Sequence, residues 1–240
     1  MKLEIIFEDD HIVIVNKPSD LLTIPHRFNT ALPSLYSALS TTYGKIFIVH
    51  RLDRETSGII IFAKNEAAHR HLSIQFEKHE TTKVYIALLD GALHQDEGEI
   101  DKPIAEHSGI AGKMVIAKRG KPSLTLYKVT ERFKHFTLVD ADIRTGRTHQ
   151  IRVHFQSMGY PLAIDALYGR RTEMLLSEIK GRKMKLGKFD EERPIMNRTT
   201  LHAARLEFTH PVSLERMVFE AEMPKDFKAL ISQLGKWGVG

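Results

Sequence analysis

The chain has 240 residues, of which 42% are hydrophobic and 27% are charged, as in an ordinary folded globular protein. Its 35 basic and 30 acidic residues leave a net charge of +5, which permits a phosphate-rich partner without requiring one. The lack of cysteine excludes disulfides, thiolate nucleophiles and cysteine-built zinc sites. No signal peptide is recognisable, and no apolar stretch approaches the roughly 20 residues that cross a bilayer. A cytoplasmic protein without membrane contact is therefore expected.

The first part of the chain predicts strands joined by short turns, with one well-marked helix. Asn65 is a suitable N-cap for that helix, and Ala68, Leu72 and Phe76 recur at helical spacing to form its inner face. The predicted elements are strands at residues 3–7 and 12–15, a short helix at 32–39, a strand at 59–63, a helix at 66–79 and a strand at 84–89.

The second part of the chain predicts more strands and one further helix. Residues 92–122 are expected to be loops with one or two edge strands. The elements after them are antiparallel strands at 124–129 and 136–143, a helix at 149–158 closed by Gly159, and closing strands at 201–208 and 217–221. Because strands outnumber helices, we predict an α+β fold, with a mixed, largely antiparallel sheet, flanking helices and a single catalytic domain over residues 1–240.

A polar turn at residues 50–58, with the sequence HRLDRETSG, runs directly into the apolar strand at 59–63. An unbroken apolar run of this length predicts a strand that is buried on both faces. Asp53 at the mouth of such a strand either stays hydrated or pairs with a cation, and Arg51 and Arg54 are the nearest ones. The turn is thus typical of a surface ion pair or of a carboxylate that is placed for chemistry on a polyanion.

Two further segments carry candidate functional residues. In the helix predicted at 149–158, Arg152 lies at the border of the apolar face, while Arg147 precedes the helix start. A cation there opposes the helix dipole unless an anion, such as a phosphate, is nearby. Tyr85 in the strand at 84–89 is typical of a core residue, or of a stacking surface for a base with a hydroxyl for proton transfer. His149 and His154 are five residues apart, which does not fit a zinc pair on one helix face, so no metal site is predicted.

The turn at 50–58 resembles the signature turn of the RluA-type pseudouridine synthases. Further motifs follow in the order of that family, so the resemblance covers residues 3–227. These motifs are NKP at 16–18, KVYIA at 83–87, GKP at 120–122, residues 145–154, GYP at 159–161 with Asp165 and Tyr168, LHA at 201–203 and THP at 209–211. The resemblance implies the pseudouridine synthase fold, without an N-terminal S4-like domain before the first strand.

The resemblance also implies an activity and a set of site residues. Such enzymes isomerise uridine to pseudouridine in structured RNA, ribosomal or transfer RNA, without a cofactor or a metal. Asp53 resembles the catalytic aspartate, which acts as a nucleophile or in proton removal; Tyr85 resembles the tyrosine that stacks on the base, and Arg152 the basic residue paired with the aspartate. The expected substrate-binding residues are Arg51, which fills the space of the flipped uridine, with His50, Arg147 and Leu206.

The departures from the family pattern are small. Asp20 and Ile164 stand where glycine is common, which affects turns rather than catalysis. The segment at 170–188 holds seven basic residues against two glutamates, which fits RNA binding or a solvated loop equally. Two alternatives remain open, an inactive RNA-binding or ribosome-assembly module, and a hydrolase that uses Asp53 with a histidine. The presence of Asp53, Tyr85 and Arg152 favours the active synthase, and large-subunit ribosomal RNA is preferred to transfer RNA.

Overall fold

The computed structural model describes residues 3–29, 31–181 and 192–237, and the chain forms two compact units. Unit 1 comprises Met1–Tyr85 and His202–Glu222, and unit 2 comprises Ile86–Leu201 and Met223–Gly240. Strand β5 (Thr82–Asp90) runs from one unit into the other, so that Tyr85 is the last residue of the first segment of unit 1.

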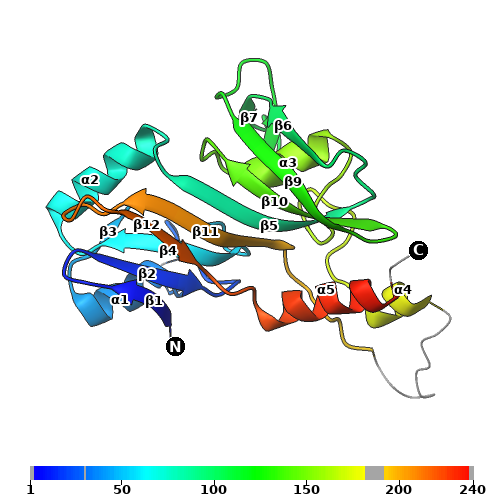
Figure 1. Cartoon of the computed structure of the whole chain (residues 1–240), viewed down its shortest axis with the longest axis horizontal. Helices are drawn as coiled ribbons and strands as arrows, with labels where there is room; N and C mark the ends of the chain where they lie inside the picture. Colours follow the sequence, from blue (N-terminus) through cyan, green and yellow to red (C-terminus); the bar gives the residue numbers. More distant parts are fainter. Residues whose placement is uncertain (1–2, 30, 182–191, 238–240) are drawn as a thin grey trace. The chain divides into compact units, whose positions relative to one another are not determined.

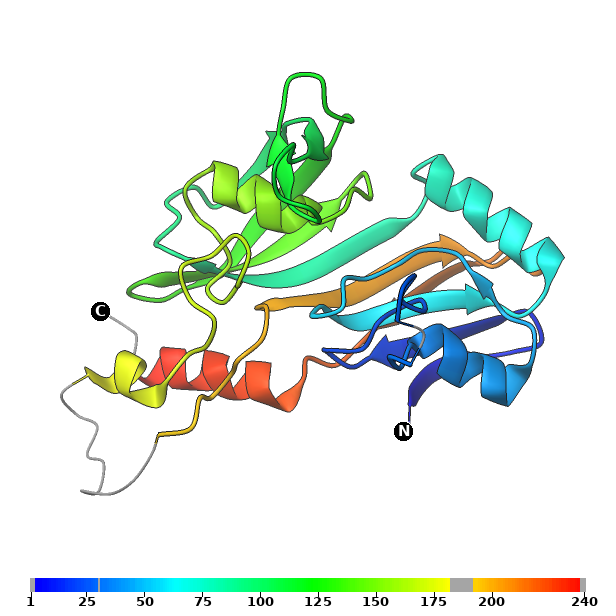
Figure 2. The same ribbon diagram turned by 180° about the vertical axis from the view of Figure 1, so that it is seen from behind.

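Unit 1 is built on a mixed sheet in which the strands follow the order β1-β2-β4-β11 (Figures 1 and 2). Strand β12 pairs with β11, and β3 pairs with β4. Strands β4 and β11 are parallel, whereas the pairs β1–β2, β2–β4, β3–β4 and β11–β12 are antiparallel. The elements are β1 (Glu4–Glu8), β2 (Ile12–Lys17), α1 (Leu35–Tyr43), β3 (Phe47–Ile48), β4 (Ser57–Ala63), α2 (Glu66–Glu77), β11 (Leu201–Thr209) and β12 (Arg216–Glu220).

The core of unit 1 follows from its apolar strands. All seven residues of β4 are buried, which confirms the prediction of a strand covered on both faces. Helix α2 begins where it was predicted, because the side chain of Asn65 accepts the N–H of Ala68 at 2.9 Å. Its Ala68 and Leu72 are fully buried, whereas Phe76 is only partly buried.

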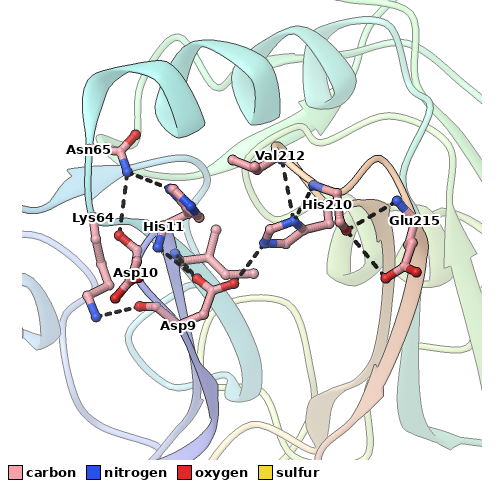
Figure 3. A network of polar contacts seen from close by, with 10 residues as sticks. Asp9, Asp10, His11, Lys64, Asn65, His210, Val212 and Glu215 are labelled. Atoms are coloured by element: carbon pink, nitrogen blue, oxygen red, sulfur yellow. Dashed lines mark hydrogen bonds and ion pairs between the residues drawn. The ribbon is translucent and has the colours of Figure 1, made fainter.

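A polar network closes the end of unit 1 where the β1–β2 turn meets the turn after β11 (Figure 3). Asp9 accepts the N–H groups of His11 and Ile12 at 2.7 and 2.8 Å. The Nδ1 atom of His210 accepts the N–H of Ser213, so its Nε2 carries the proton and donates it to Asp9 at 2.8 Å. Burial raises the pKa of Asp9, but these hydrogen bonds outweigh burial and hold the pKa below its ordinary value of 3.8.

Unit 2 contains the sheet order β5-β10-β9-β6 and a separate pair, β7 with β8 (Figure 1). Strands β9 and β10 are antiparallel neighbours, as predicted. The region at 92–122 holds three strands, more than the one or two that were expected. The elements are β6 (Glu97–Asp101), β7 (Ile104–Glu106), β8 (Met114–Ile116), β9 (Leu124–Arg132), β10 (Phe136–Ile143), α3 (Gln150–Ser157), α4 (Leu176–Lys180) and α5 (Lys225–Trp237).

The core of unit 2 depends on a helix that the sequence analysis did not predict. Helix α5 places Phe227, Leu230 and Leu234 in the same apolar cluster as Phe136 and Leu138 of β10. The basic segment at 170–188 includes α4, and the part of it from residue 182 onward lies outside the described residues. In the part of the chain that the structure describes, no helix is both long and apolar enough to cross a membrane.

Candidate active site

Asp53 lies in the turn between β3 and β4, where the sequence placed it. Its carbonyl accepts the N–H of Thr56 at 3.2 Å, which closes the turn immediately before the buried strand begins. Gly58 follows with φ of +121°, at the point where β4 pairs with Ala203 of β11. A Cβ atom at this glycine would lie 2.2 Å from the Ala203 carbonyl oxygen, so the close approach of the two strands requires glycine. The Asp53 turn is therefore anchored to the centre of the sheet.

The last residue of β2 and the segment that follows it hold the backbone of the Asp53 turn. Lys17 is fully buried, and its Nζ donates to the carbonyls of Pro18, Leu21 and Arg54 at 2.8–3.0 Å. The hydroxyl of Thr23 accepts the N–H of Leu52 and donates to its carbonyl. These bonds fix the backbone on both sides of Asp53. The sequence analysis included Lys17 in a motif but did not predict this role.

Tyr85 and Leu206 belong to the same unit as Asp53. The ring of Tyr85 is buried. Burial and, as a smaller cause, the negative charge of Asp53 raise the pKa of its hydroxyl. The carboxylate thus acts electrostatically on the phenol, and the phenol keeps its proton at neutral pH. Leu206 on β11 is 1% exposed and is paired with Phe219 of β12.

His50 and Arg51 differ in their surroundings. The ring of His50 stacks on Phe76 with 4.6 Å between ring centroids, and its Nε2 accepts the N–H of Ile61. Burial, together with the nearby charge of Lys83, lowers the pKa of His50 to about 3, so the imidazole is neutral at physiological pH. These contacts account for His50 without a substrate. Arg51 is exposed, and the substrate-binding roles of both residues remain predictions.

Arg152 lies on α3 in unit 2 and is 4% exposed. Its Nε and Nη2 atoms donate to the two carboxylate oxygens of Asp165 at 2.7 and 2.8 Å. The sequence analysis expected Arg152 to pair with Asp53, which belongs to unit 1, and it did not foresee Asp165 as a partner. The pairing with Asp53 remains a prediction. Asp165 stood in one of the family motifs, but sequence spacing alone gave no signal for its partner.

Arg147 lies just before α3, as predicted. Its Nε donates to the carbonyl of Pro122 at 3.1 Å, and its backbone N–H donates to the side-chain oxygen of Gln150. The predicted anion near this residue remains untested. Among the described residues, no group of three or more histidine or acidic side chains is arranged to hold a metal ion.

Comparison with known proteins decides the family. The family model described as RNA pseudouridylate synthase matches residues 11–157, and Ribosomal large subunit pseudouridine synthase D of Zymomonas mobilis is 36% identical over 97% of this chain and 73% of that protein. The chain belongs to the RNA pseudouridine synthase family. This synthase is also 40% identical to Dual-specificity RNA pseudouridine synthase RluA of Vibrio vulnificus, over 88% of this chain and 79% of the relative.

A solved structure supports the same assignment. Human RNA Pseudouridylate Synthase Domain Containing 1 aligns with a TM-score of 0.70 and 29% identity, over 93% of this synthase and 84% of the human chain. The resemblance inferred from the motifs and the predicted α+β class are both confirmed. The chain is accordingly an isomerase of RNA uridines.

Proposed function

We propose that this synthase converts uridine to pseudouridine in large-subunit ribosomal RNA rather than in transfer RNA, with Asp53 as the catalytic carboxylate. The Zymomonas mobilis relative is named for the large ribosomal subunit, and the Vibrio vulnificus relative for dual specificity. The net charge of +5 fits a polyanionic partner of this kind. We place the reaction in the cytoplasm.

The reaction is an isomerisation in which all atoms are retained. The bond from the sugar C1′ to N1 of the base breaks, a bond from C1′ to C5 forms, and the proton on C5 is lost while N1 gains one. Such chemistry needs a carboxylate at the sugar and a group that holds or moves a proton at the base. Asp53 and Tyr85 supply both.

The observation that carries the proposal is the electrostatic coupling of Asp53 with Tyr85 inside unit 1. A tyrosine hydroxyl is protonated at neutral pH, and burial together with the charge of Asp53 raises the pKa of Tyr85 further, so its hydroxyl can donate a hydrogen bond at the base and is not a phenolate. Its flat ring suits stacking on a flipped base, and Leu206 offers an apolar contact to the same base. Arg51 would fill the space that the uridine vacates, with His50 beside it, while Arg147 would contact phosphate.

The test maps pseudouridines in ribosomal and transfer RNA from cells with and without this gene. We expect one or more positions of the large-subunit RNA to lose the modification, and restoration by the wild-type gene but not by Asp53→Asn. Asp10→Asn, a change of an exposed carboxylate in the same unit, serves as the matched control and should restore the modification. Normal modification by Asp53→Asn would refute the role of Asp53, and loss confined to transfer RNA would refute the substrate. No loss in either RNA, with RNA binding retained, would favour an inactive binding module.

A further inference from the structure

The guanidinium of Arg152 is held from two directions by groups of its own unit. The Asp165 side chain, which is 0% exposed, forms the bidentate ion pair described above. The ring of Tyr168 lies against the guanidinium, with the ring centroid 5.0 Å from Cζ. A guanidinium that donates two parallel hydrogen bonds and stacks on an aromatic ring has little freedom to rotate.

Tyr168 connects this cation to the surrounding backbone. Its hydroxyl accepts the N–H of Met114 at 2.7 Å and lies 2.8 Å from Nδ1 of His149. Its own N–H donates to Asp165 at 3.0 Å. His149, the N-cap of α3, has φ of +53°, a strained conformation for a residue with a side chain, and the contact with Tyr168 helps to maintain it. The position of Arg152 is thus set by strand β8, the start of α3 and the turn at Asp165.

Stability alone is a poor reason for such a pair. Removing two charges from water is costly, and replacing a buried ion pair by apolar residues of similar volume is often neutral or stabilising. A fixed orientation of the cation explains the arrangement better.

We propose that Asp165 and Tyr168 are positioning residues for catalysis, which fix the guanidinium of Arg152 before substrate binds. The proposal rests on the proposed function, to which it adds Arg152 as the basic residue that acts on the substrate, a role that the family resemblance implies. Asp165 and Tyr168 touch neither the base nor the sugar in this scheme, and they act only through Arg152.

The discriminating substitution is Asp165→Asn, which keeps the shape and much of the turn. The oxygen of the asparagine can still accept the N–H groups of Leu167 and Tyr168, which Asp165 Oδ1 accepts at 2.9 and 3.0 Å. Its NH₂ group, however, would face the Nε donor of Arg152 in place of an acceptor. The substitution therefore displaces the guanidinium while it leaves the local backbone bonded.

The chain offers a matched control for the loss of a bidentate pair. Asp226 of α5 binds Arg198 through the same atoms and at the same distances, 2.7 Å to Nε and 2.8 Å to Nη2, elsewhere in unit 2. Asp226→Asn should lower the melting temperature without a change in kcat. Tyr168→Phe keeps the ring and loses the hydroxyl, whereas Tyr168→Leu also loses the stacking on Arg152.

The assay measures pseudouridine formation on large-subunit ribosomal RNA from cells that lack this gene, or on their transfer RNA if wild-type enzyme modifies that instead. Asp165→Asn should lower kcat about 10- to 100-fold, because small misplacements of an active group cost that much, while KM stays within about twofold. Tyr168→Leu should lower kcat more than Tyr168→Phe, and Asp165→Glu should recover part of the loss.

The proposal is refuted if Asp165→Asn leaves kcat unchanged, if Asp226→Asn lowers kcat equally, or if the loss appears only in KM. In those cases Asp165 is merely a structural residue, while the proposed function stands as long as wild-type enzyme is active and Asp53→Asn is not. Wild-type enzyme that modifies neither RNA would refute the proposed function itself.

Discussion

Gly58→Ala tests how closely β4, the strand after the Asp53 turn, must approach β11. A methyl group at this position would lie 2.2, 2.6 and 2.7 Å from the carbonyl oxygen, amide nitrogen and carbonyl carbon of Ala203, all of which are backbone atoms. Comfortable contacts between non-bonded atoms begin near about 3.5 Å, so the two paired strands would have to separate. A flexible side chain could move aside, but the backbone of a paired strand cannot do so without breaking its hydrogen bonds.

The expected loss of stability can be worked from two terms. Overpacking a well-filled core costs about 1–3 kcal/mol, and holding a residue with a side chain at φ of +121° adds about 1–3 kcal/mol. We therefore expect Gly58→Ala to lower the free energy of unfolding by about 4 kcal/mol, a large share of the roughly 5–15 kcal/mol of a typical domain.

Urea unfolding followed by circular dichroism would measure this loss, with two other glycines as controls. Gly146→Ala meets no atom within 4 Å, and Gly159→Ala also meets none but has φ of +87°. The first should be nearly neutral, and the second should cost about 1 kcal/mol from backbone strain alone. A loss below about 1 kcal/mol for Gly58→Ala, with an unchanged m-value, would refute the argument from strand approach.

Two further predictions concern unit 1. Lys17→Met would leave three carbonyl acceptors without their buried donor, so the free energy of unfolding should fall by about 3 kcal/mol. The kcat should also fall, because the Arg54 carbonyl adjoins Asp53. Urea unfolding and initial rates of the variant test this, and an unchanged stability with an unchanged kcat would contradict it. Asp9 has a lowered pKa, so its contribution to stability is present above the ordinary value of 3.8 and is lost as the pH falls through the folded-state value. The difference in unfolding free energy between wild type and Asp9→Asn should thus narrow as the pH falls from about 5 to well below the ordinary pKa of 3.8, and a constant difference would show that the Asp9 carboxylate charge contributes nothing.

Local patterns predicted the elements of this fold well where they were strong. The unbroken apolar run of β4 and the Asn65 cap of α2 both appear in the structure as expected. Helix α5 was missed although Phe227, Leu230 and Leu234 recur at helical spacing, because the sequence analysis took the strands before it as the end of the fold. Ile231 of the same helix also packs against this cluster, so the apolar pattern was present in the sequence.

The sequence analysis did not predict which side chains far apart along the chain form ion pairs or hydrogen bonds. Asp53 and Tyr85 were predicted from motif positions, and their electrostatic coupling adds a physical link between them. The pairing of Arg152 with Asp165 was not predicted, because a charge in a motif specifies neither which carboxylate it meets nor in which geometry. The role of Lys17 in holding the Asp53 turn was likewise not predicted, because its acceptors are backbone carbonyls, which have no sequence signature.

The division of unit 1 into two sequence segments has a consequence for synthesis on the ribosome. Strand β4 is translated early, yet β11, its parallel neighbour, emerges only after more than half of the chain has followed. Until then, the apolar edge of the nascent β4 is open to wrong partners, which makes this interval the one most exposed to aggregation. A message that ends before codon 201 would yield a polypeptide whose first segment can never complete its sheet, and we expect such fragments to be degraded rather than to accumulate.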